Sequence, residues 1–380
     1  MVNKQIKICT NCVMDSTDPN IKFDDNGLCD HCKNYRSNID PLLNSMADSP
    51  AKLNSLISDI QDRGRKCEYD CILGLSGGLD SSYMLHMLTT KYKLRTLVFH
   101  VDCGWNTERA TSNIRKMVDV LGINLFTKVV DWEEMRDLQL SFFKSGVSYI
   151  DTPQDHAYTA TMYYYAKKNN IKTIINGGNF STEGVRNPLD WLYHGSDLKN
   201  ILDIYNQHST RKRLDKFPLS DIFFHKIYLN YFKRIKVVKP LNLIEYNKKG
   251  AILELSEKYD WMPYAEKHYE SRFTKFFEGY WLPTRFGYDT RKVQYSSLIL
   301  SKQLSRRDAL AKLSHLSLTD TEIKIEFQYV ADKLQIDTSE LRHYLEMPKS
   351  IYSDYKNRAA IFGIGSKVMK ILGLEKSVKR

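Results

Sequence analysis

The sequence lacks long hydrophobic runs. No apolar stretch approaches the roughly 20 residues that a membrane-spanning helix needs, and the first nine residues, Met1–Cys9, have no apolar core of the kind found in secretory signals. Internal repeats and low-complexity segments are absent as well. We therefore expect no membrane insertion and a cytoplasmic location.

The composition also excludes a disordered or collagen-like chain. Of the 380 residues, 42% are apolar and 27% are charged, which is ordinary for a protein with a sizeable core. A chain of this length holds two or three domains rather than one small module.

Acidic residues are outnumbered by basic ones. Lys and Arg total 56 against 45 Asp and Glu, so the formal net charge is +11. Basic residues are spread through the chain, with local runs at Arg211–Arg213 and in the tail Lys376–Arg380. A nucleic-acid surface, basic pockets for small phosphorylated ligands and a merely solvated surface all fit this charge. Charge alone does not decide the partner.

The seven cysteines argue against a disulfide framework, because their number is odd and no secretory signal precedes them. Four of them form two Cys-x2-Cys pairs, Cys9 with Cys12 and Cys29 with Cys32, with 16 residues between the pairs. Each pair can place two thiolates on one tight knuckle, and two knuckles complete a tetrahedral Zn²⁺ site with no open position. We predict a structural zinc site, with a redox pair as the competing interpretation.

Short apolar stretches alternate with helical patterns in the central part of the chain. The sequence predicts strands at Cys71–Leu75, Leu94–Val101, Leu125–Val130 and Lys172–Asn176, and helices at about 81–91, 106–121, 132–144 and 155–169. Strands that alternate with helices form a parallel sheet with helices on both faces. The predicted fold class is therefore α/β.

Four regions follow from these patterns. Residues 1–35 form the predicted zinc-binding knuckle, 36–66 a helical linker, 67–186 the α/β domain, and 187–380 a mostly helical region that binds substrate or partner. The last region is rich in Tyr, Phe and Lys, and its pattern shows no further strand–helix–strand unit.

A glycine-rich loop, Ser76-Gly-Gly-Leu-Asp-Ser-Ser82, follows the first predicted strand and opens a helix. Its glycines let backbone N–H groups approach an anion at the helix N-terminus. The Gly-Lys-Ser/Thr ending of a Walker loop is missing. The loop resembles the PP-loop of the N-type ATP pyrophosphatases, which bind ATP and release pyrophosphate on making an adenylated intermediate. Asp80 and Ser81 are the catalytic candidates here, with Asp80 as a Mg²⁺ ligand. The nucleotide-binding candidates are Ser76, Gly77, Gly78, Leu79, Asp80, Ser81 and Ser82.

Two later strand ends supply further candidates, because open α/β sheets bind ligands beyond the carboxyl ends of their strands. Val101 and Asp102 end the second strand, where PP-loop enzymes usually meet the adenosine half of ATP. His100 and Trp105 beside them fit a packing role equally well. After the later strand, the candidate ligands of Mg²⁺ or phosphate are Gly177, Gly178, Asn179 and Glu183.

Motifs outside the loop narrow the resemblance. They are Thr152–His156, Ile174–Asn179, Lys267–Phe277, Leu282–Gly287 and Ser296–Ser301. With the four-cysteine start, the whole resembles the N-acetyl sugar amidotransferases of bacterial surface-polysaccharide biosynthesis, from about residue 5 to about residue 315. The fold that the resemblance implies is a PP-loop ATP pyrophosphatase of the HUP-like kind. The last 65 or so residues carry no motif that we identify.

The resemblance implies that an acetamido group on a nucleotide-linked sugar becomes an acetamidino group, with ATP, Mg²⁺ and Zn²⁺ as cofactors. An amide oxygen is a very poor leaving group, and ammonia is a weak nucleophile toward an amide. Transfer of AMP to that oxygen gives an O-adenylated imidate, from which AMP leaves when ammonia attacks. Mg²⁺ and the loop amides would neutralise the phosphate charge in the transition state.

The source of ammonia is indicated by an absence. Position 2 is Val, so no N-terminal Cys nucleophile is available for an internal glutaminase. The remaining cysteines, Cys67, Cys71 and Cys103, lie in or beside predicted strands and are expected in the core. The family resemblance implies separate partner subunits, similar to the glutaminase and cyclase of imidazole glycerol phosphate synthase, which deliver ammonia through a channel.

The segment 267–277 combines aromatic and basic residues. Tyr269, Phe273, Phe276 and Phe277 are spaced by three or four positions or lie next to each other, which indicates a helix face toward the core. Basic residues on another face could hold a nucleotide-sugar diphosphate or lie on a plain surface. Lys267 and His268 are further catalytic candidates, and Arg291 is a weaker phosphate-binding one. The substrate-binding candidates are His156, Lys267, Tyr269, Arg272 and Arg285.

Two other functions stay open. PP-loop enzymes that thiolate tRNA also combine cysteine-rich zinc modules with a basic surface, but they usually need reactive cysteines near the ATP site, and Cys103 alone is suitably placed. We therefore do not expect a nucleic-acid partner. A protein that binds ATP without chemistry would not need the full Ser-Gly-Gly-x-Asp-Ser loop.

Overall fold

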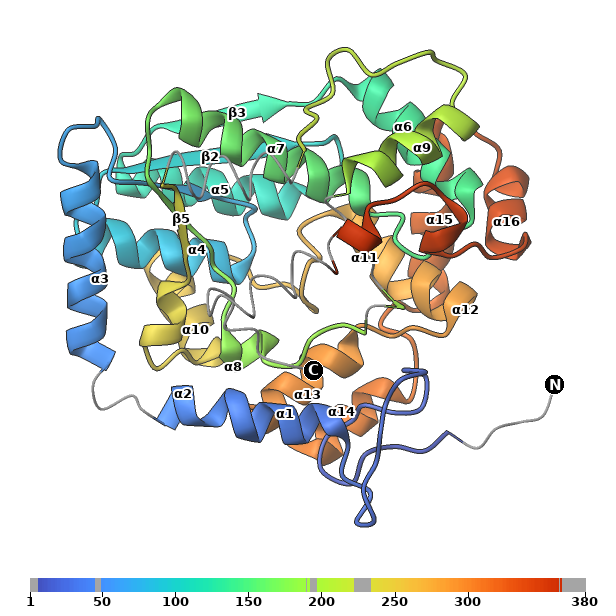
Figure 1. The fold of residues 1–380 in the computed structure, drawn as a ribbon, viewed down its shortest axis with the longest axis horizontal. Helices are drawn as coiled ribbons and strands as arrows, with labels where there is room; N and C mark the ends of the chain where they lie inside the picture. Colours follow the sequence, from blue (N-terminus) through green and yellow to red (C-terminus); the bar gives the residue numbers. More distant parts are fainter. Residues whose placement is uncertain are drawn as a thin grey trace.

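The computed structural model describes residues 6–44, 49–188, 190–191, 197–221, 234–361 and 363. Its centre is a five-stranded parallel sheet in the order β3-β2-β1-β4-β5 (Figure 1). The strands are β1 Cys71–Gly74, β2 Thr96–Asp102, β3 Leu125–Val129, β4 Thr173–Ile175 and β5 Lys236–Val238. The predicted α/β architecture is confirmed. Val2 and the basic tail Lys376–Arg380 lie outside the described residues.

The edge strand β5 was not expected from the sequence, which predicts no strand after residue 186. β5 pairs with β4, with Ile174 opposite Val237. It is three residues long, and two of its three side chains are exposed, so it lacks the apolar run of a central strand. The sheet therefore extends beyond residue 186 and takes its fifth strand from the region predicted to be mostly helical.

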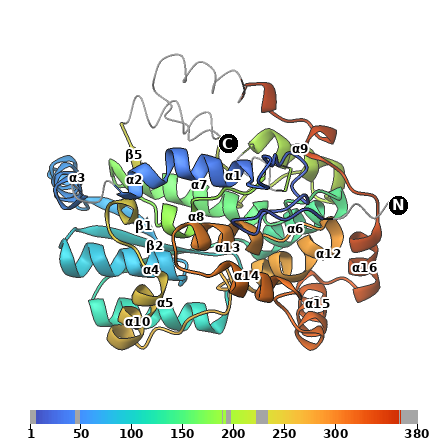
Figure 2. The same ribbon diagram turned by 90° about the horizontal axis from the view of Figure 1, so that it is seen from below.

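Both faces of the sheet are covered, as Figure 2 shows for α7 on one side and α4, α5 and α10 on the other. Leu73 and Val98 join a core with the second group of helices. Ile72 and Leu97 point the opposite way and pack with α7, because successive side chains of a strand alternate between faces. The covering helices are α3 Ser49–Gly64, α4 Leu79–His86, α5 Glu108–Leu121, α7 Thr152–Lys168 and α10 Lys248–Tyr259.

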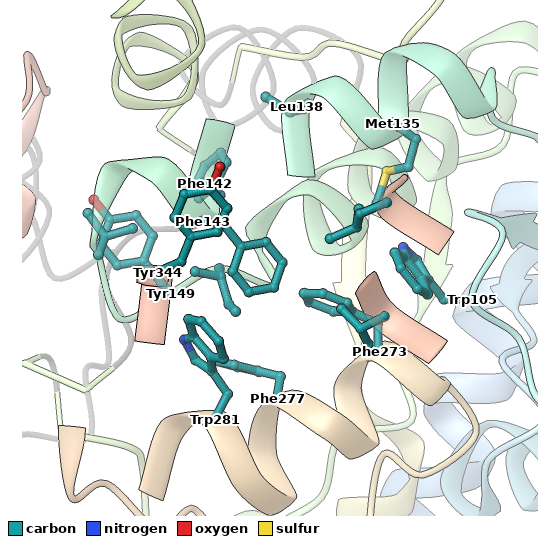
Figure 3. Close-up of a cluster of buried hydrophobic side chains, with 14 of the residues drawn as sticks. Trp105, Met135, Leu138, Phe142, Phe143, Tyr149, Phe273, Phe277, Trp281 and Tyr344 are labelled. Atoms are coloured by element: carbon teal, nitrogen blue, oxygen red, sulfur yellow. The ribbon is translucent and has the colours of Figure 1, made fainter. Parts of the chain in front are cut away.

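A second core lies beside the sheet and consists largely of aromatic rings (Figure 3). Trp105, which follows β2, lies 5.0 Å from Phe273 between ring centroids, and Phe143 lies 4.8 Å from Trp281. Trp105 thus has a packing role. The helices around this core are α6 Trp132–Ser145, α9 Leu198–His208, α11 Arg272–Phe276, the π-helical turn Phe277–Trp281, α12 Leu282–Phe286, α15 Asp320–Leu334 and α16 Thr338–Glu346.

The N-terminal cysteine region is not an isolated module. With α1 it packs on Val185, Trp191 and Val293, and the backbone N–H of Val13 donates to Ser296 Oγ at 3.2 Å. Lys292 also forms an ion pair with Asp15. The elements here are α1 Asp30–Asn38, α2 Asp40–Asn44, α8 Phe180–Glu183, α13 Arg291–Leu300 and α14 Arg306–Leu313.

Three shorter helical segments complete the description: a π-helical turn Met87–Lys91 after α4, and 3-10 turns at Pro240–Leu243 and Tyr352–Asp354. Within the described residues, no helix has both the length and the apolar character needed to cross a membrane.

Candidate active site

The glycine-rich loop connects β1 to α4 and is held in shape by its own serines. Ser76 Oγ accepts a hydrogen bond from the N–H of Gly78 at 3.2 Å, and Ser81 Oγ lies 3.2 Å from Ser76 Oγ. Gly77 has a φ of +82°, and a Cβ there would lie 2.7 Å from the carbonyl oxygen of Ala110. Glycine is therefore required at this turn, both for its backbone angle and for space.

The loop after β4 packs against the loop after β1. A Cβ on Gly177 would lie 3.2 Å from the backbone carbonyl carbon of Asp80. β1 is the strand from which the chain order runs outward in two directions, to β2 on one side and β4 on the other. Ligands of open α/β sheets bind at such a point, beyond the carboxyl ends of the strands. The two loops meet where a phosphate ligand is expected.

An ion-pair network crosses this point. Lys267 Nζ lies 2.9 Å from Asp80 Oδ2 and 2.5 Å from Glu183 Oε1, and Tyr246 donates to Asp80 Oδ1 at 2.6 Å. Burial by itself would raise the pKa of Asp80, but the Lys267 ammonium and the Tyr246 hydroxyl hold it below its usual value. Asp80 is therefore an anion in the folded protein, aligned by residues far from it in sequence.

A cavity of about 340 Å³ opens onto this network. Its floor is formed by the two loops, with Asp80, Gly178 and Glu183 among the lining residues. Further lining residues come from α7, α10, α13 and the segment 261–270. We call it the first cavity.

A second cavity, of about 510 Å³, lies at the ends of β1 and β2. It is lined by His100 and Val101 of β2. Acidic side chains at the start of α7 and in the π-helical turn Phe277–Trp281 line it as well. The two cavities meet, since both are lined by Ser76, Ser81, Tyr158, Gly177, His268 and Glu270. The pair thus offers two compartments that share one junction at the glycine-rich loop.

The acidic group in the second cavity comprises Asp151, Asp155 and Glu278. Burial, together with the charge of Asp155, raises the pKa of Asp151 to about 7. Burial and the charge of Glu278 raise the pKa of Asp155 to about 6, although the nearby His268 opposes this. Thr274 Oγ1 donates to Asp151 Oδ2 at 2.8 Å. The carboxyl groups of Asp151 and Asp155 therefore change protonation near neutral pH.

His268 lines both cavities and adopts a φ of +67°, which is uncommon for a residue other than glycine. Its Nδ1 lies 3.2 Å from Glu278 Oε1. Burial would lower the pKa of His268, but Glu278 outweighs this and the pKa rises to about 9. The imidazole is therefore charged at neutral pH.

The pairing of His268 with Glu278 predicts a pH-dependent stability. Because the folded-state pKa of about 9 lies above the ordinary 6.5, the folded protein binds this proton more tightly than the unfolded chain does. The stabilisation is fully present below pH 6.5 and is lost as the pH rises through 9. Thermal unfolding should show that His268→Gln removes part of the wild-type decline in Tm over this window. An unchanged decline would contradict the pairing, and His315→Gln, at an exposed position, serves as the control.

Several predicted site residues line the cavities. Ser76, Gly78, Leu79, Asp80, Ser81, Gly177, Gly178, Glu183, Lys267 and His268 line the first, and Val101 lines the second. Gly77 shapes the turn of the glycine-rich loop. Asn179 caps α8 by accepting from the N–H of Thr182, and its side-chain amide lies 3.4 Å from Asp80 Oδ1. Asp102 accepts from the N–H of Gly104 and so holds the turn after β2.

Besides Gly77, Asp102 and Asn179, five more predicted site residues line neither cavity. Ser82 Oγ is buried without a partner among the described residues. His156 Nε2 accepts from the N–H of Ser220, and Tyr269 pairs with Ser317. Arg272 forms an ion pair with Glu326. Arg285 donates to the carbonyls of Leu345, Met347 and Pro348, so its guanidinium fixes a chain turn instead of binding a phosphate.

The structure also adds residues that the sequence did not single out. Glu270 accepts a hydrogen bond from Ser76 Oγ at 3.2 Å and lines both cavities. Tyr246 holds Asp80, and Lys248 lines the first cavity. Glu270 lies within the quoted motif 267–277, so its place there was a usable signal. Tyr246 and Lys248 lie in no recognised motif.

The four cysteines of the two pairs converge. Their Sγ atoms all lie within 4.8 Å of one another, with 3.8 Å between Cys9 and Cys32 and 3.6 Å between Cys12 and Cys29. A tetrahedral ion with sulfur ligands at about 2.3 Å has sulfur–sulfur edges of about 3.8 Å. Backbone N–H groups of Asn11 and Cys29 point at Cys9 Sγ, as expected for a thiolate. The donor set fits one tetrahedral metal ion.

Residues 270–369 match the family described as the C-terminal domain of LPS biosynthesis proteins like WbpG. This part of the chain is similar to the WbpG-like domain. The match confirms the predicted family resemblance and extends it, since it continues past residue 315, where the sequence showed no further motif. The matched segment contributes Glu270, Thr274 and Glu278 to the second cavity.

Solved structures that are similar to this chain share little of its sequence. The NH3-dependent NAD synthetase from Campylobacter jejuni subsp. jejuni NCTC 11168, in complex with the nitrate ion, has a TM-score of 0.32 at 14% identity, over 80% of this chain and 99% of its own. The NMN synthetase from Francisella tularensis scores 0.33 at 13% identity, over 80% and 98%. The U34-tRNA thiolase NcsA from Methanococcus maripaludis, with its [4Fe-4S] cluster, scores 0.30 at 16% identity, over 70% and 80%. No curated protein matches the sequence.

The predicted α/β fold class, with its N-terminal four-cysteine cluster, is confirmed. Its basis in this chain is the parallel sheet with the Ser-Gly-Gly-Leu-Asp-Ser loop after its central strand, the four-cysteine cluster and the helical C-terminal region.

Proposed function

We propose that the protein is an ATP-dependent amidotransferase that converts an acetamido group of a nucleotide-linked sugar to an acetamidino group during surface-polysaccharide biosynthesis. The observation that carries the proposal is the junction of two cavities at a PP-loop, lined on both sides by Ser76, Ser81 and Gly177. Two compartments with one shared junction suit a reaction in which a nucleotide and an acceptor must meet. The WbpG-like domain supports the pathway, since the family is named for LPS biosynthesis.

In this proposal ATP places its adenosine half in the second cavity, near Val101, and its phosphates along the loop. The acetamido oxygen attacks the α-phosphorus, an oxygen–phosphorus bond forms, and the bond to pyrophosphate breaks. Ammonia then attacks the imidate carbon, AMP leaves with the former acetamido oxygen, and the surplus protons pass to solvent. Backbone N–H groups of the loop and Lys267 stabilise the charge that develops on phosphate.

Mg²⁺ is implied by this chemistry, and the residues present fit it. Asp80 and Glu183 direct two carboxylates to one place, and oxygen donors of this kind suit a hard cation. These carboxylates would hold the ion, which would neutralise phosphate charge. For the cysteine cluster we propose zinc, because a closed site of four thiolates is typical of structural Zn²⁺.

Thiolation of tRNA is less well supported. Among the described residues, Cys103 is the cysteine that lines one of these two cavities. It is buried, and burial raises the pKa of its thiol well above the ordinary value. A thiol that stays protonated is a poor nucleophile, and no second cysteine of the described chain lies beside it in that cavity.

The proposal is tested by incubating the protein with ATP, Mg²⁺, ammonium and a panel of nucleotide-linked N-acetyl sugars. Mass spectrometry should find one acceptor in which NH replaces one oxygen, in step with AMP and pyrophosphate. Formation of ADP and phosphate during turnover, or no modified acceptor across the panel, would count against the proposal.

We also propose that ammonia comes from partner subunits resembling a glutaminase and a cyclase. The purified protein should use ammonium salts, with a rate that rises with pH as the fraction of free NH3 increases, and it should not use glutamine. Adding such a partner pair should restore glutamine-dependent turnover. Conversion of glutamine to glutamate by the protein alone would show a nucleophile within this chain and refute the partner.

A further inference from the structure

One side of the first cavity is built from helices instead of sheet loops, and the reaction chemistry above does not use it. We call this side the helical wall. Its residues come from α10, from the segment after α10 and from α13, and they are Lys248, Ile252, Trp261, Tyr264, Gln294, Tyr295 and Leu298.

The carboxylates that line the first cavity already have partners. Asp80 and Glu183 are bound by Lys267. Glu266 accepts from the Tyr295 hydroxyl at 2.6 Å, and Glu270 accepts from Ser76. Among the described residues, none of these four carboxylates forms an ion pair with Lys248.

Lys248 is a cation on this wall that lacks such a partner. Its backbone N–H donates to Gln303 Oε1, but its ammonium group makes no ion pair with any described residue. Burial lowers the pKa of this ammonium, and the more distant Glu266 and Asp80 oppose that effect. A half-buried cation without a counter-ion is unfavourable, so an anion that arrives with a ligand would gain an unusually strong contact.

The rest of the wall suits the remainder of such a ligand. Trp261 and Tyr264 meet edge to face, with ring centroids 5.8 Å apart, and Tyr264 also donates to the carbonyl of Gly77, which ties the wall to the PP-loop. Ile252 and Leu298 add apolar surface. Flat apolar faces beside one cation match a ring that carries a phosphate.

We propose that the helical wall binds the phosphate-bearing part of the acceptor, with Lys248 as its phosphate contact. The inference rests on the proposed function, because it takes the acceptor to be a phosphorylated or nucleotide-linked sugar. It assigns the first cavity to the acceptor and leaves the adenosine half of ATP to the second. ATP also carries phosphates, so the experiment must separate the two sources.

The test uses the full chain saturated with Mg²⁺ and α,β-methylene-ATP, which fills the nucleotide site without reacting. UDP and N-acetylglucosamine 1-phosphate are then titrated by calorimetry. Lys248→Ala should weaken binding of at least one probe by about tenfold to a hundredfold, the range for one charge-assisted contact. Lys248→Arg should keep most of the affinity. Lys249→Ala removes the same charge from the adjacent exposed residue and should change nothing.

Affinity for α,β-methylene-ATP, measured alone, should change less than twofold in Lys248→Ala, which also shows that the variant is folded. An equal loss for the ATP analogue would place Lys248 in the nucleotide site and overturn the inference. Unchanged binding of both probes, or no binding of either to the wild type, would also overturn it. Failure of the proposed function would be seen in the activity assay instead, where the wild type would form no AMP and pyrophosphate.

Discussion

Asp80→Asn is expected to reduce formation of AMP and pyrophosphate by at least about a thousandfold, in line with loss of an electrostatic contact used in the transition state. The Asp80 carboxylate is held by Lys267 at 2.9 Å and Tyr246 at 2.6 Å, and it lies at the junction of the two loops. Asparagine keeps the shape and one acceptor oxygen but removes the charge. Steady-state assays of pyrophosphate release, together with the Mg²⁺ dependence of the rate, measure this effect.

The folded state should tolerate the change. Lys267 keeps its contact with Glu183 at 2.5 Å, and Tyr246 can still donate to the amide oxygen. We therefore expect a loss of stability of no more than about 2 kcal/mol. Asp119→Asn, at an exposed carboxylate paired with Arg115, is the matched control and should leave both rate and stability unchanged. Near-normal turnover in Asp80→Asn would show that the reaction does not need the Asp80 carboxylate.

Loss of the metal should have the largest effect on stability. Elemental analysis should find one zinc ion per chain in the wild type and no zinc in Cys9→Ser. Metal binding by four thiolates contributes strongly to folding, so Tm should fall by about 10 °C or more. Cys67→Ser, at a half-buried cysteine outside the cluster, is the control and should retain the zinc.

Removal of the metal from the knuckle should destabilise more of the chain than its first 35 residues. The knuckle packs on Val185 and Val293, which lie beside α8 and on α13, and Arg306 donates to the carbonyls of Cys9 and Cys12. Hydrogen exchange should therefore increase in α13 as well as in the N-terminal region when the metal is removed. A fully stable and active wild type without any metal would contradict a structural site, and iron in place of zinc would correct the identity of the ion.

The central part of the fold could be predicted because its signals are local. Strands such as Cys71–Gly74 are short apolar runs bounded by turns, and the loop after β1 is a motif of seven consecutive residues. The four-cysteine cluster follows from spacing, since a Cys-x2-Cys pair can place two thiolates on one tight knuckle. β5 has no such signal, because two of its three side chains are exposed and its place is set by pairing with β4.

The candidate site was harder to predict because the side chains that hold Asp80 come from segments far away in the sequence. Tyr246 and Lys267 reach Asp80 across 166 and 187 positions of the chain. Arg285 shows the opposite error. Its sequence context suggested phosphate binding, yet its guanidinium is used by three carbonyl groups. A basic side chain therefore does not reveal from sequence whether it faces a ligand or satisfies buried backbone.

The central claim is that ATP activates the acetamido oxygen by adenylation. It is tested most directly with an acceptor whose acetamido oxygen carries a heavy isotope. The proposed chemistry predicts that the label appears in AMP, with none in pyrophosphate, and that one labelled AMP forms for each acetamidino group. Unlabelled AMP, or ADP and phosphate as the products, would contradict it.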